Sequence, residues 1–232
     1  MKKDIDQKRK ELWRPFIQAK NKLVSVVAAR RTGKSTAVIQ KALQHKENTY
    51  IVYSHRFTKE LSLQKMIEWL NQNKIHATVH FRPGQPTELD LKDFKIYMTY
   101  IDRLVEVMRQ DNFAKNVHWI FEEPELFDET LEYMDSIDMF DHALSVTLIG
   151  TYQTKKDTFT KQFHQLAEKE GYAQVIDIYD SGLFSSKEIR EIKKWYSNPE
   201  LFELECLCLK PRKNKILNFI KSTYHNIFPS LS

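Results

Sequence analysis

The stretch AARRTGKST, residues 28–36, contains a Gly-Lys-Ser core and directly follows the apolar run LVSVV. This order predicts a strand, a tight loop and a helix, the setting in which backbone N–H groups and the helix dipole bind phosphate. Gly33 permits the bend, Lys34 can reach β- and γ-phosphate oxygens, and the Ser35 hydroxyl can ligate Mg²⁺. Ala28 stands where such loops usually begin with glycine, and a methyl group is compatible with that position. We therefore predict a nucleotide site formed by consecutive residues: Ala29, Arg30, Arg31, Thr32, Gly33, Lys34, Ser35 and Thr36.

Two adjacent glutamates, Glu122 and Glu123, follow the apolar segment VHWIF. A nucleotide hydrolase needs one carboxylate that helps to hold the metal and another that orients the attacking water. We assign Glu122 to Mg²⁺ through a bridging water, although its side chain also suits a direct contact, and Glu123 to the attacking water. Aspartate is the usual residue at the first position, so Glu122 departs from the pattern. Paired acids at a strand end are common without catalysis, and it is the phosphate loop upstream that favours a catalytic role.

Two further residues are candidates for nucleotide contacts. Thr151 ends the apolar run TLIGT, where a polar side chain could sense the γ-phosphate; the alternative is a strand that simply ends in a turn. Gln18 precedes the phosphate loop, and its amide could read the donor and acceptor edges of adenine. An ordinary surface glutamine is the alternative for Gln18.

Two arginines, Arg30 and Arg31, occupy loop positions that usually carry small or neutral residues. Charge builds on the γ-phosphoryl oxygens in the transition state, and an arginine aimed at them raises the rate of hydrolysis. One of the two could act in this way within its own subunit. The other could contact a neighbouring subunit, DNA or only solvent.

Strands and helices alternate along the chain, which predicts an α/β fold with a mostly parallel sheet and helices on both faces. Residues 82–90 are predicted as a loop, because Pro and Gly fill turn positions. Ligands of such sheets bind at the carboxyl ends of the strands, where the phosphate loop, the glutamates and Thr151 all fall. The predicted strands are 22–29, 49–55, 74–81, 94–101, 117–121, 143–151 and 174–180, and the predicted helices are 33–46, 59–73, 101–110, 126–137 and 158–171.

The composition of the 232 residues is typical of a globular protein, with 41% hydrophobic and 29% charged residues. No apolar run approaches the roughly 20 residues of a membrane span, and the charged start MKKDIDQKRKELW lacks the apolar core of a signal peptide. We therefore expect an intracellular protein that does not associate with membranes. Cys206 and Cys208 are too close together in the sequence for a disulfide between them to cross-link the fold. They are predicted to be reduced packing residues.

The charges are unevenly distributed along the chain, whose net charge is +5. Residues 116–154 contain no Lys or Arg, while acidic residues gather there. Basic residues gather at 8–10, 30–31, 155–156, 193–194 and 210–221. A basic balance is compatible with a polyanionic partner, although each cluster taken alone also fits an ordinary solvated face.

Together these residues resemble the ATPase domain of the large terminase subunit of tailed phages, the motor that packages DNA into a procapsid. The loop ARRTGKST is similar to the arginine-bearing, glycine-poor loop of that family, and Gln18 lies where the family has an adenine-recognising glutamine. VHWIFEEP stands in the place of the family's metal-binding and catalytic acids, and LIGT matches its coupling motif. YSNPELFELECLCL, residues 196–209, is similar to the segment that ends the family's ATPase domain. The motifs span residues 13–209, and their combination is more specific than any one alone.

The resemblance implies a P-loop NTPase of the ASCE type that uses ATP and Mg²⁺. In that family the residue matching Arg30 is the arginine finger that acts within its own subunit. The implied partners are double-stranded DNA, the portal protein of the procapsid, the small terminase subunit and identical subunits in a ring, a pentamer. The protein would work in the host cytoplasm during phage assembly and transiently at the portal vertex.

One departure from the family concerns the end of the chain. Terminase large subunits continue into a nuclease of the RNase H type, whereas residues 210–232 are too short for another sheet and contain no carboxylate. We therefore expect an ATPase domain at 1–209, a basic tail at 210–232 and no nuclease activity. The tail could contact DNA phosphates in a salt-sensitive way, or could only add solubility. An excised motor domain and a naturally short protein both fit this pattern.

Other functions share these motifs. A helicase or recombination ATPase is one, but a two-domain helicase needs a second domain for which the chain has no room. A nucleotide-binding switch with little turnover is another, and the departures at Ala28 and Glu122 are compatible with it. A small-molecule kinase is disfavoured, because no Arg-rich segment that could close over a second substrate is found.

Overall fold

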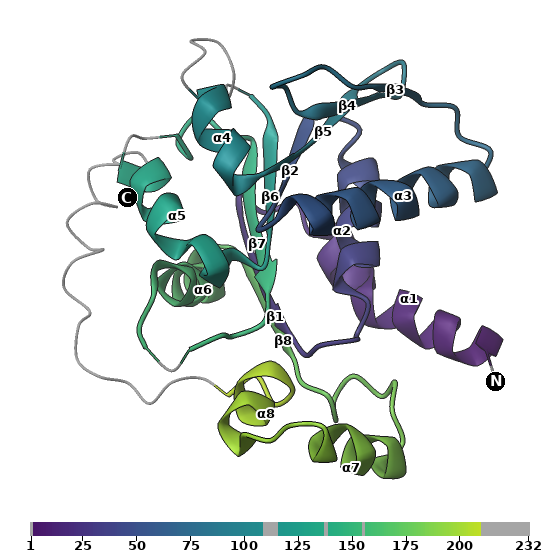
Figure 1. Cartoon of the computed structure of the whole chain (residues 1–232), viewed down its shortest axis with the longest axis vertical. Coiled ribbons are helices and arrows are strands. Elements are labelled where there is room, and N and C mark those ends of the chain that lie inside the picture. The colour runs from purple at the N-terminus through teal and green to yellow at the C-terminus, as the bar shows by residue number, and fades with distance from the viewer. Residues whose placement is uncertain (1, 109–115, 137–138, 155, 210–232) are drawn as a thin grey trace.

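The computed structural model describes residues 2–108, 116–136, 139–154 and 156–209 of the chain (Figure 1). An eight-stranded sheet lies at its centre. The strands are β1 Leu23–Ala28, β2 Thr49–Tyr53, β3 Thr78–His80, β4 Thr87–Asp90, β5 Lys95–Tyr100, β6 His118–Glu122, β7 Ser145–Gly150 and β8 Tyr172–Ile176. The helices are α1 Lys2–Gln18, α2 Lys34–His45, α3 Arg56–Gln72, α4 Ile101–Met108, α5 Asp128–Ser136, α6 Phe159–Glu170, α7 Ser186–Lys194 and α8 Pro199–Glu205, with a 3₁₀ turn, η1, at Pro124–Phe127. The predicted basic tail, 210–232, lies outside the described residues, and the division at 209 stays a prediction.

The strand order across the sheet is β3-β4-β5-β2-β6-β7-β1-β8. From β5 to β8 all neighbours pair in parallel, while β3 and β4 pair antiparallel at one edge. Strand β7 therefore lies between β1, which precedes the phosphate loop, and β6, which ends at Glu122. Because these three strands run in the same direction, their carboxyl ends lie side by side at the same end of the sheet. The topology thus brings together the motifs that the sequence places on separate strands.

Helices cover both faces of the sheet, as predicted (Figure 1). One face packs against α1, α2 and α3, in a core that includes Phe16 and Met66. The other packs against α4, α5 and α6, in a core that includes Leu131 and Phe163. Every residue of β1, β2, β6 and β7 is buried. Burial on both faces explains why these strands read as continuous apolar runs rather than as alternating patterns.

A third core cluster lies beyond the carboxyl end of β1, where α7 and α8 pack against the sheet (Figure 1). It joins Val27 of β1 to Ile189 of α7 and Phe202 of α8. The end of α8 consequently lies against the phosphate loop, since the backbone N–H of Arg30 donates to the carbonyl of Glu205 at 3.0 Å. This contact makes the 196–209 segment part of the nucleotide-site region.

The structure corrects the predicted elements at one edge of the sheet. Residues 87–90, predicted as a loop, form β4, and the predicted strand 74–81 is reduced to Thr78–His80. Side chains of β4 alternate between buried and half-buried positions, a pattern that is common in antiparallel strands. The Pro-Gly turn is confined to the preceding loop, where the N–H of Gln85 donates to the carbonyl of Arg82 at 3.1 Å. Four alternating residues beside such a turn are too weak a signal to recognise from sequence.

Two other differences concern charged segments and a strand end. Residues 2–18 and 186–194 form helices that are not among the predicted elements. Strand β8 ends at Ile176, four residues earlier than predicted. The Asp177 carboxylate accepts the backbone N–H groups of Tyr179 and Asp180 at 2.7 Å, and this side-chain turn ends the strand.

Two findings concern possible membrane spans and the two cysteines. No helix in the described part of the chain has the length and apolar character needed to cross a membrane. Cys206 and Cys208 are both buried in the third core cluster, as expected of packing residues.

Candidate active site

The loop between β1 and α2 has the backbone of an anion-binding turn. Gly33 has φ 101° and Arg31 has φ 68°, so two of its residues adopt left-handed conformations. The Thr32 hydroxyl donates to the Ala29 carbonyl at 2.8 Å and closes the turn. Gly33 is the N-cap residue of α2 and has no side chain with which to satisfy the first N–H groups of the helix. Those groups are therefore open to a phosphate.

Ala28 occupies the position at which such loops usually begin with glycine. Its backbone does not have a positive φ, so a Cβ introduces no strain there. The residue is fully buried, and its carbonyl accepts a hydrogen bond from Lys34 Nζ at 3.1 Å. The departure from glycine is therefore compatible with the loop geometry.

Lys34 joins the ends of three strands. Its Nζ lies 3.1 Å from the Ala28 carbonyl of β1, 3.3 Å from the Thr151 hydroxyl after β7, and 3.3 Å from Glu123 Oε1 after β6. The side chain is 8% exposed, so its charge acts in a partly dehydrated setting. The structure thus gathers the phosphate loop, the paired glutamates and Thr151 around one cation.

Glu122 is the last residue of β6 and is buried. One carboxylate oxygen accepts the Ser35 hydroxyl at 2.5 Å, and the other has no hydrogen-bond partner among the described residues. Burial raises the pKa of the Glu122 carboxyl, and the negative charge of Glu123 adds to the increase. Mg²⁺ prefers oxygen ligands, and a cation beside this buried oxygen would favour the charged carboxylate. Ser35 and Glu122 therefore offer a hydroxyl and a carboxylate oxygen that fit a magnesium site.

Glu123 follows β6 and turns the chain into η1 with φ 56°. Its Oε2 accepts the Thr151 backbone N–H at 2.8 Å and the Thr151 hydroxyl at 2.9 Å. The Glu123 side chain remains 22% exposed. A left-handed conformation is costly for a residue with a side chain, and such conformations gather at functional sites. The backbone therefore holds this carboxylate beside Lys34 with one side open to water, as a general base requires.

Gly150 ends β7 and passes very close to the chain at Glu123. A Cβ at this position would lie 2.9 Å from Cδ of Pro124 and 3.1 Å from Cα of Glu123. Both contacts are with atoms of constrained groups, a proline ring and a backbone. Only glycine therefore allows β7 and the Glu123 turn to approach this closely.

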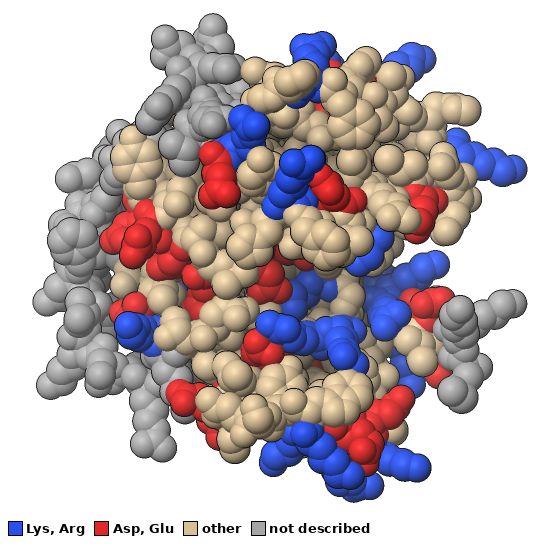
Figure 2. Space-filling view, viewed as in Figure 1, with Lys and Arg blue, Asp and Glu red and all other residues tan. Residues whose placement is uncertain are grey.

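Arg30 and Arg31 lie on the side of the loop that faces α7 and α8. The Arg30 guanidinium is paired with Glu205 at 2.7 Å, and the Arg31 guanidinium lies 4.5 Å from the ring centroid of Trp195. Both arginines line a cavity of about 220 Å³. Figure 2 shows basic side chains around a hollow between the α1–α2 region and the α7–α8 region. The structure therefore shows the side chain of Arg30, a residue of the phosphate loop, in contact with the end of α8.

Gln18 is the last residue of α1 and is exposed. Helix α1 contacts the phosphate loop through Trp13, whose Nε1 donates to the Thr32 carbonyl at 2.9 Å. The Arg9 side chain also reaches the loop, with its Cδ 3.8 Å from the position of a Cβ on Gly33. Adenine recognition by Gln18 stays a prediction.

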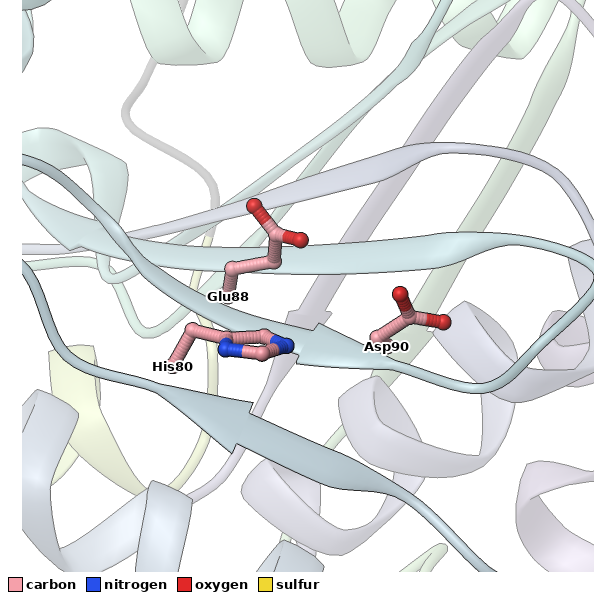
Figure 3. Close-up of side chains that lie close together, drawn as sticks. All are labelled: His80, Glu88 and Asp90. Atoms are coloured by element: carbon pink, nitrogen blue, oxygen red, sulfur yellow. The ribbon is translucent and has the colours of Figure 1, made fainter.

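A second group of possible metal ligands lies on β3 and β4, outside this cluster. His80 pairs directly with Glu88, and Asp90 lies two residues further along β4 (Figure 3). Their ligand atoms lie within 4.8 Å of one another. Lys95 Nζ already contacts Glu88 at 2.6 Å, and this cation offsets the negative charge that a metal would need. We assign no metal to this group.

Comparison with known proteins gives a structural likeness without a sequence match. No protein-family model and no curated protein sequence matches the chain. The large terminase of the thermophilic bacteriophage D6E is similar in structure, with a TM-score of 0.66 and 11% sequence identity over 87% of this chain and 52% of that one. The same terminase in complex with ATP-γ-S gives a TM-score of 0.64 over the same shares at 11% identity. The HK97 bacteriophage large terminase gives 0.56 at 12% identity, over 81% of this chain and 46% of that one.

The chain spans about half the length of these terminases. At such low identity the likeness concerns the fold. This chain shares with these terminases an α/β fold, a mostly parallel sheet flanked by helices, as the sequence predicts.

Proposed function

We propose that this chain is an ATP-hydrolysing motor domain that drives double-stranded DNA into a phage procapsid. The observation that carries the proposal is the cluster at the ends of β1, β6 and β7. In it, Ser35 contacts Glu122 at 2.5 Å, and Lys34 lies 3.3 Å from Glu123. The structural likeness to phage large terminases supports the choice of this motor among P-loop ATPases.

The proposed mechanism assigns one task to each group of the cluster. The N–H groups of the loop and Lys34 would bind the β- and γ-phosphates, and Ser35 and Glu122 would hold Mg²⁺. When bound, Mg²⁺ would neutralise phosphate charge and orient the nucleotide. Glu123 orients the attacking water and accepts its proton. Thr151 contacts both Lys34 and Glu123 and can therefore report the loss of the γ-phosphate.

The arginines complete the proposed site. Arg30 stabilises the charge that develops on the γ-phosphoryl oxygens, as in the family that the sequence resembles. To do so, its guanidinium exchanges the Glu205 carboxylate for the phosphate. Arg31 is proposed to face a neighbouring subunit, and Gln18 is proposed to read adenine.

The proposed assembly is a homo-oligomeric ring, a pentamer, on the portal protein at the procapsid vertex. The small terminase subunit and double-stranded DNA are its other proposed partners. The protein would act in the host cytoplasm during assembly. The basic tail, which is proposed to contact DNA phosphates, lies outside the described residues, and nuclease activity is not expected from residues 1–209.

The test of this function is ATP turnover by the purified chain, measured with and without duplex DNA. We expect turnover that duplex DNA stimulates and that removal of Mg²⁺ with EDTA abolishes. A Lys34→Ala preparation, purified in parallel, controls for contaminating ATPases. Nucleotide binding without turnover in every condition would contradict a motor and favour a nucleotide-binding switch. Strand displacement by the purified chain would instead favour a helicase.

Gly150→Ala tests the close approach of β7 to Glu123. The added methyl group must push Pro124 or the Glu123 backbone aside, because the contacts would be 2.9 and 3.1 Å. A misplacement of about 1 Å can cost up to ~10²-fold in rate, so we expect steady-state ATP turnover to fall at least about tenfold. ATP binding should stay near that of the wild type. The control is Gly182→Ala, where a Cβ meets nothing within 4 Å and only the left-handed φ of 62° adds strain, so it separates backbone strain from the steric clash at Gly150. Equal turnover in both variants would show that the close approach of β7 to Glu123 does not matter for catalysis.

A further inference from the structure

A cleft of about 490 Å³ lies apart from the nucleotide cluster, near the ends of β2 and β5. Its walls come from the start of α3, the loop between β3 and β4, and the junction of β5 with α4. Figure 1 shows α3, α4 and the β3–β4 pair around this end of β5. None of the residues assigned to nucleotide or metal binding lines the cleft.

The lining of the cleft is strongly cationic. Arg56 and Lys59 come from α3, Arg82 from the β3–β4 loop and Arg103 from α4, while Glu60 is the one acidic residue of the lining. Glu60 is paired with Arg56 at 2.7 Å, one helical turn away. This exposed pair offsets a single positive charge. The lining therefore has a surplus of positive charge that an anionic partner would complement.

The surroundings of Lys59 favour the binding of an anion in the cleft. Its Nζ donates to the neutral Thr87 hydroxyl at 3.1 Å, and burial lowers the pKa of the Lys59 ammonium. A lowered pKa means that the surroundings disfavour the charged form of the lysine. A bound anion would favour that form, so the site gains from binding one.

The rim of the cleft adds an aromatic ring to these cations. Phe81 is 68% exposed and is adjacent to Arg82 in the loop. At the junction of β5 with α4, Arg103 Nε donates to the Tyr100 hydroxyl at 3.3 Å. Cationic side chains bind phosphate oxygens, and apolar ring faces can pack against sugars, so the mixture suits a sugar-phosphate backbone.

The sheet register connects the cleft to the nucleotide cluster. Tyr100 of β5 pairs with Tyr53 of β2, and Tyr53 pairs with Glu122 of β6. Two strand spacings of about 4.8 Å therefore separate the Tyr100 backbone from that of Glu122. A partner in the cleft would lie at the carboxyl end of the same continuous sheet, where the nucleotide also lies.

We propose that this cleft binds the phosphate backbone of double-stranded DNA, an inference that rests on the proposed motor function. A whole duplex is too wide to enter a cleft of this size, because its major groove alone is about 12 Å wide. The cleft can therefore hold phosphates and sugars of one strand while the base pairs stay outside. Contacts to phosphates do not depend on the base sequence. A motor that moves along DNA of any sequence needs contacts of this kind.

The test compares two double variants of the full chain. Arg56→Gln/Arg82→Gln removes two cations of the cleft, and Lys20→Gln/Lys169→Gln removes two exposed lysines that precede β1 and β8, at the opposite edge of the sheet. Fluorescence anisotropy measures binding of a labelled duplex oligonucleotide over a range of salt concentrations. We expect the cleft variant to bind about tenfold more weakly and to lose about two units of the slope of log K against log salt. Binding of a fluorescent ATP analogue serves as the folding check and should not change.

The outcomes separate failure of the cleft from failure of the motor. If the cleft variant binds duplex with the affinity and salt slope of the wild type, while duplex DNA still stimulates wild-type turnover, the cleft assignment alone is wrong. If the wild type hydrolyses ATP but binds no duplex, both proposals fail. If a single-stranded oligonucleotide binds more tightly than duplex and depends on the same arginines, the cleft is a single-strand site and the duplex assignment is overturned.

Discussion

The substitution Glu123→Gln should leave ATP bound but not hydrolysed. Glutamine has nearly the same shape, and its amide oxygen can keep the hydrogen bonds from Thr151. It cannot accept a proton from the attacking water. General bases contribute about 10²–10⁴-fold to the rate, so we expect single-turnover hydrolysis of labelled ATP to slow by that factor. Affinity for a fluorescent ATP analogue should be unchanged, because Lys34, Ser35 and the loop N–H groups remain.

A matched control for this substitution is Glu132→Gln, which removes one exposed carboxylate from α5. It changes the net charge by the same amount without touching the cluster, and its turnover should equal that of the wild type. Turnover by Glu123→Gln within a few-fold of the wild type would show that another group activates the water. Loss of ATP binding by Glu123→Gln would instead assign the carboxylate to holding Lys34.

The nearness of Lys34 to the two glutamates can be predicted from sequence. Both motifs directly follow apolar runs, and strands that alternate with helices form parallel sheets whose carboxyl ends share an edge. The structure brings Lys34 within 3.3 Å of Glu123, although the strands that carry them are not neighbours. The catalytic roles of these residues stay predictions.

Other features of the site depend on tertiary packing that no local pattern encodes. The strand order decides that β7 separates β1 from β6, so the tight fit of Gly150 against Glu123 follows only from the topology. The pairing of Arg30 with Glu205 requires the third core cluster to bring α8 against the phosphate loop. Sequence indicates that an arginine is present in the loop, but not what contacts it.

The segment that follows Thr151 is attached to the segment that follows Glu123 by hydrogen bonds and an ion pair to carboxylates. Glu125 accepts the Gln153 backbone N–H at 2.6 Å, and its side chain lies 3.1 Å from Lys161 Nζ. Both members of this ion pair are 1% exposed. Lys161 also donates to the Thr154 carbonyl, so one cation and one carboxylate fix the path of the chain between β7 and α6.

Asp128 extends the same attachment to the start of α6. Its carboxylate accepts the backbone N–H of Phe159 at 2.7 Å and that of Thr160 at 2.8 Å, the groups that a helix leaves unpaired at its first turn. The acidic stretch of the sequence therefore does not form only a solvated face. Part of it anchors the region that begins at Thr151, and the contact between Thr151 and Glu123 depends on that anchoring.

Glu125→Ala should consequently destabilise the fold more than any other single change considered above. It leaves the Lys161 ammonium buried without its carboxylate, and breaking a buried ion pair in this way costs about 3–5 kcal/mol. That is a large part of the roughly 5–15 kcal/mol that stabilises a typical domain. Urea unfolding followed by circular dichroism gives the free energy of unfolding. ATP turnover measured well below the unfolding midpoint should also fall, because the segment that positions Thr151 loses its main attachment.

Two further variants test whether the effect of Glu125→Ala comes from the buried ion pair. Glu129→Ala removes an exposed carboxylate from the same region, and such surface changes usually alter stability by less than about 0.5 kcal/mol. The double variant Glu125→Ala/Lys161→Met removes the stranded charge as well, and it should recover part of the lost stability, because apolar replacement of a whole buried pair is often tolerated. If Glu125→Ala and Glu129→Ala unfold at the same urea concentration, the pair does not anchor the segment. If the double variant regains stability but not turnover, the ion pair acts on Thr151 through geometry rather than through folding alone.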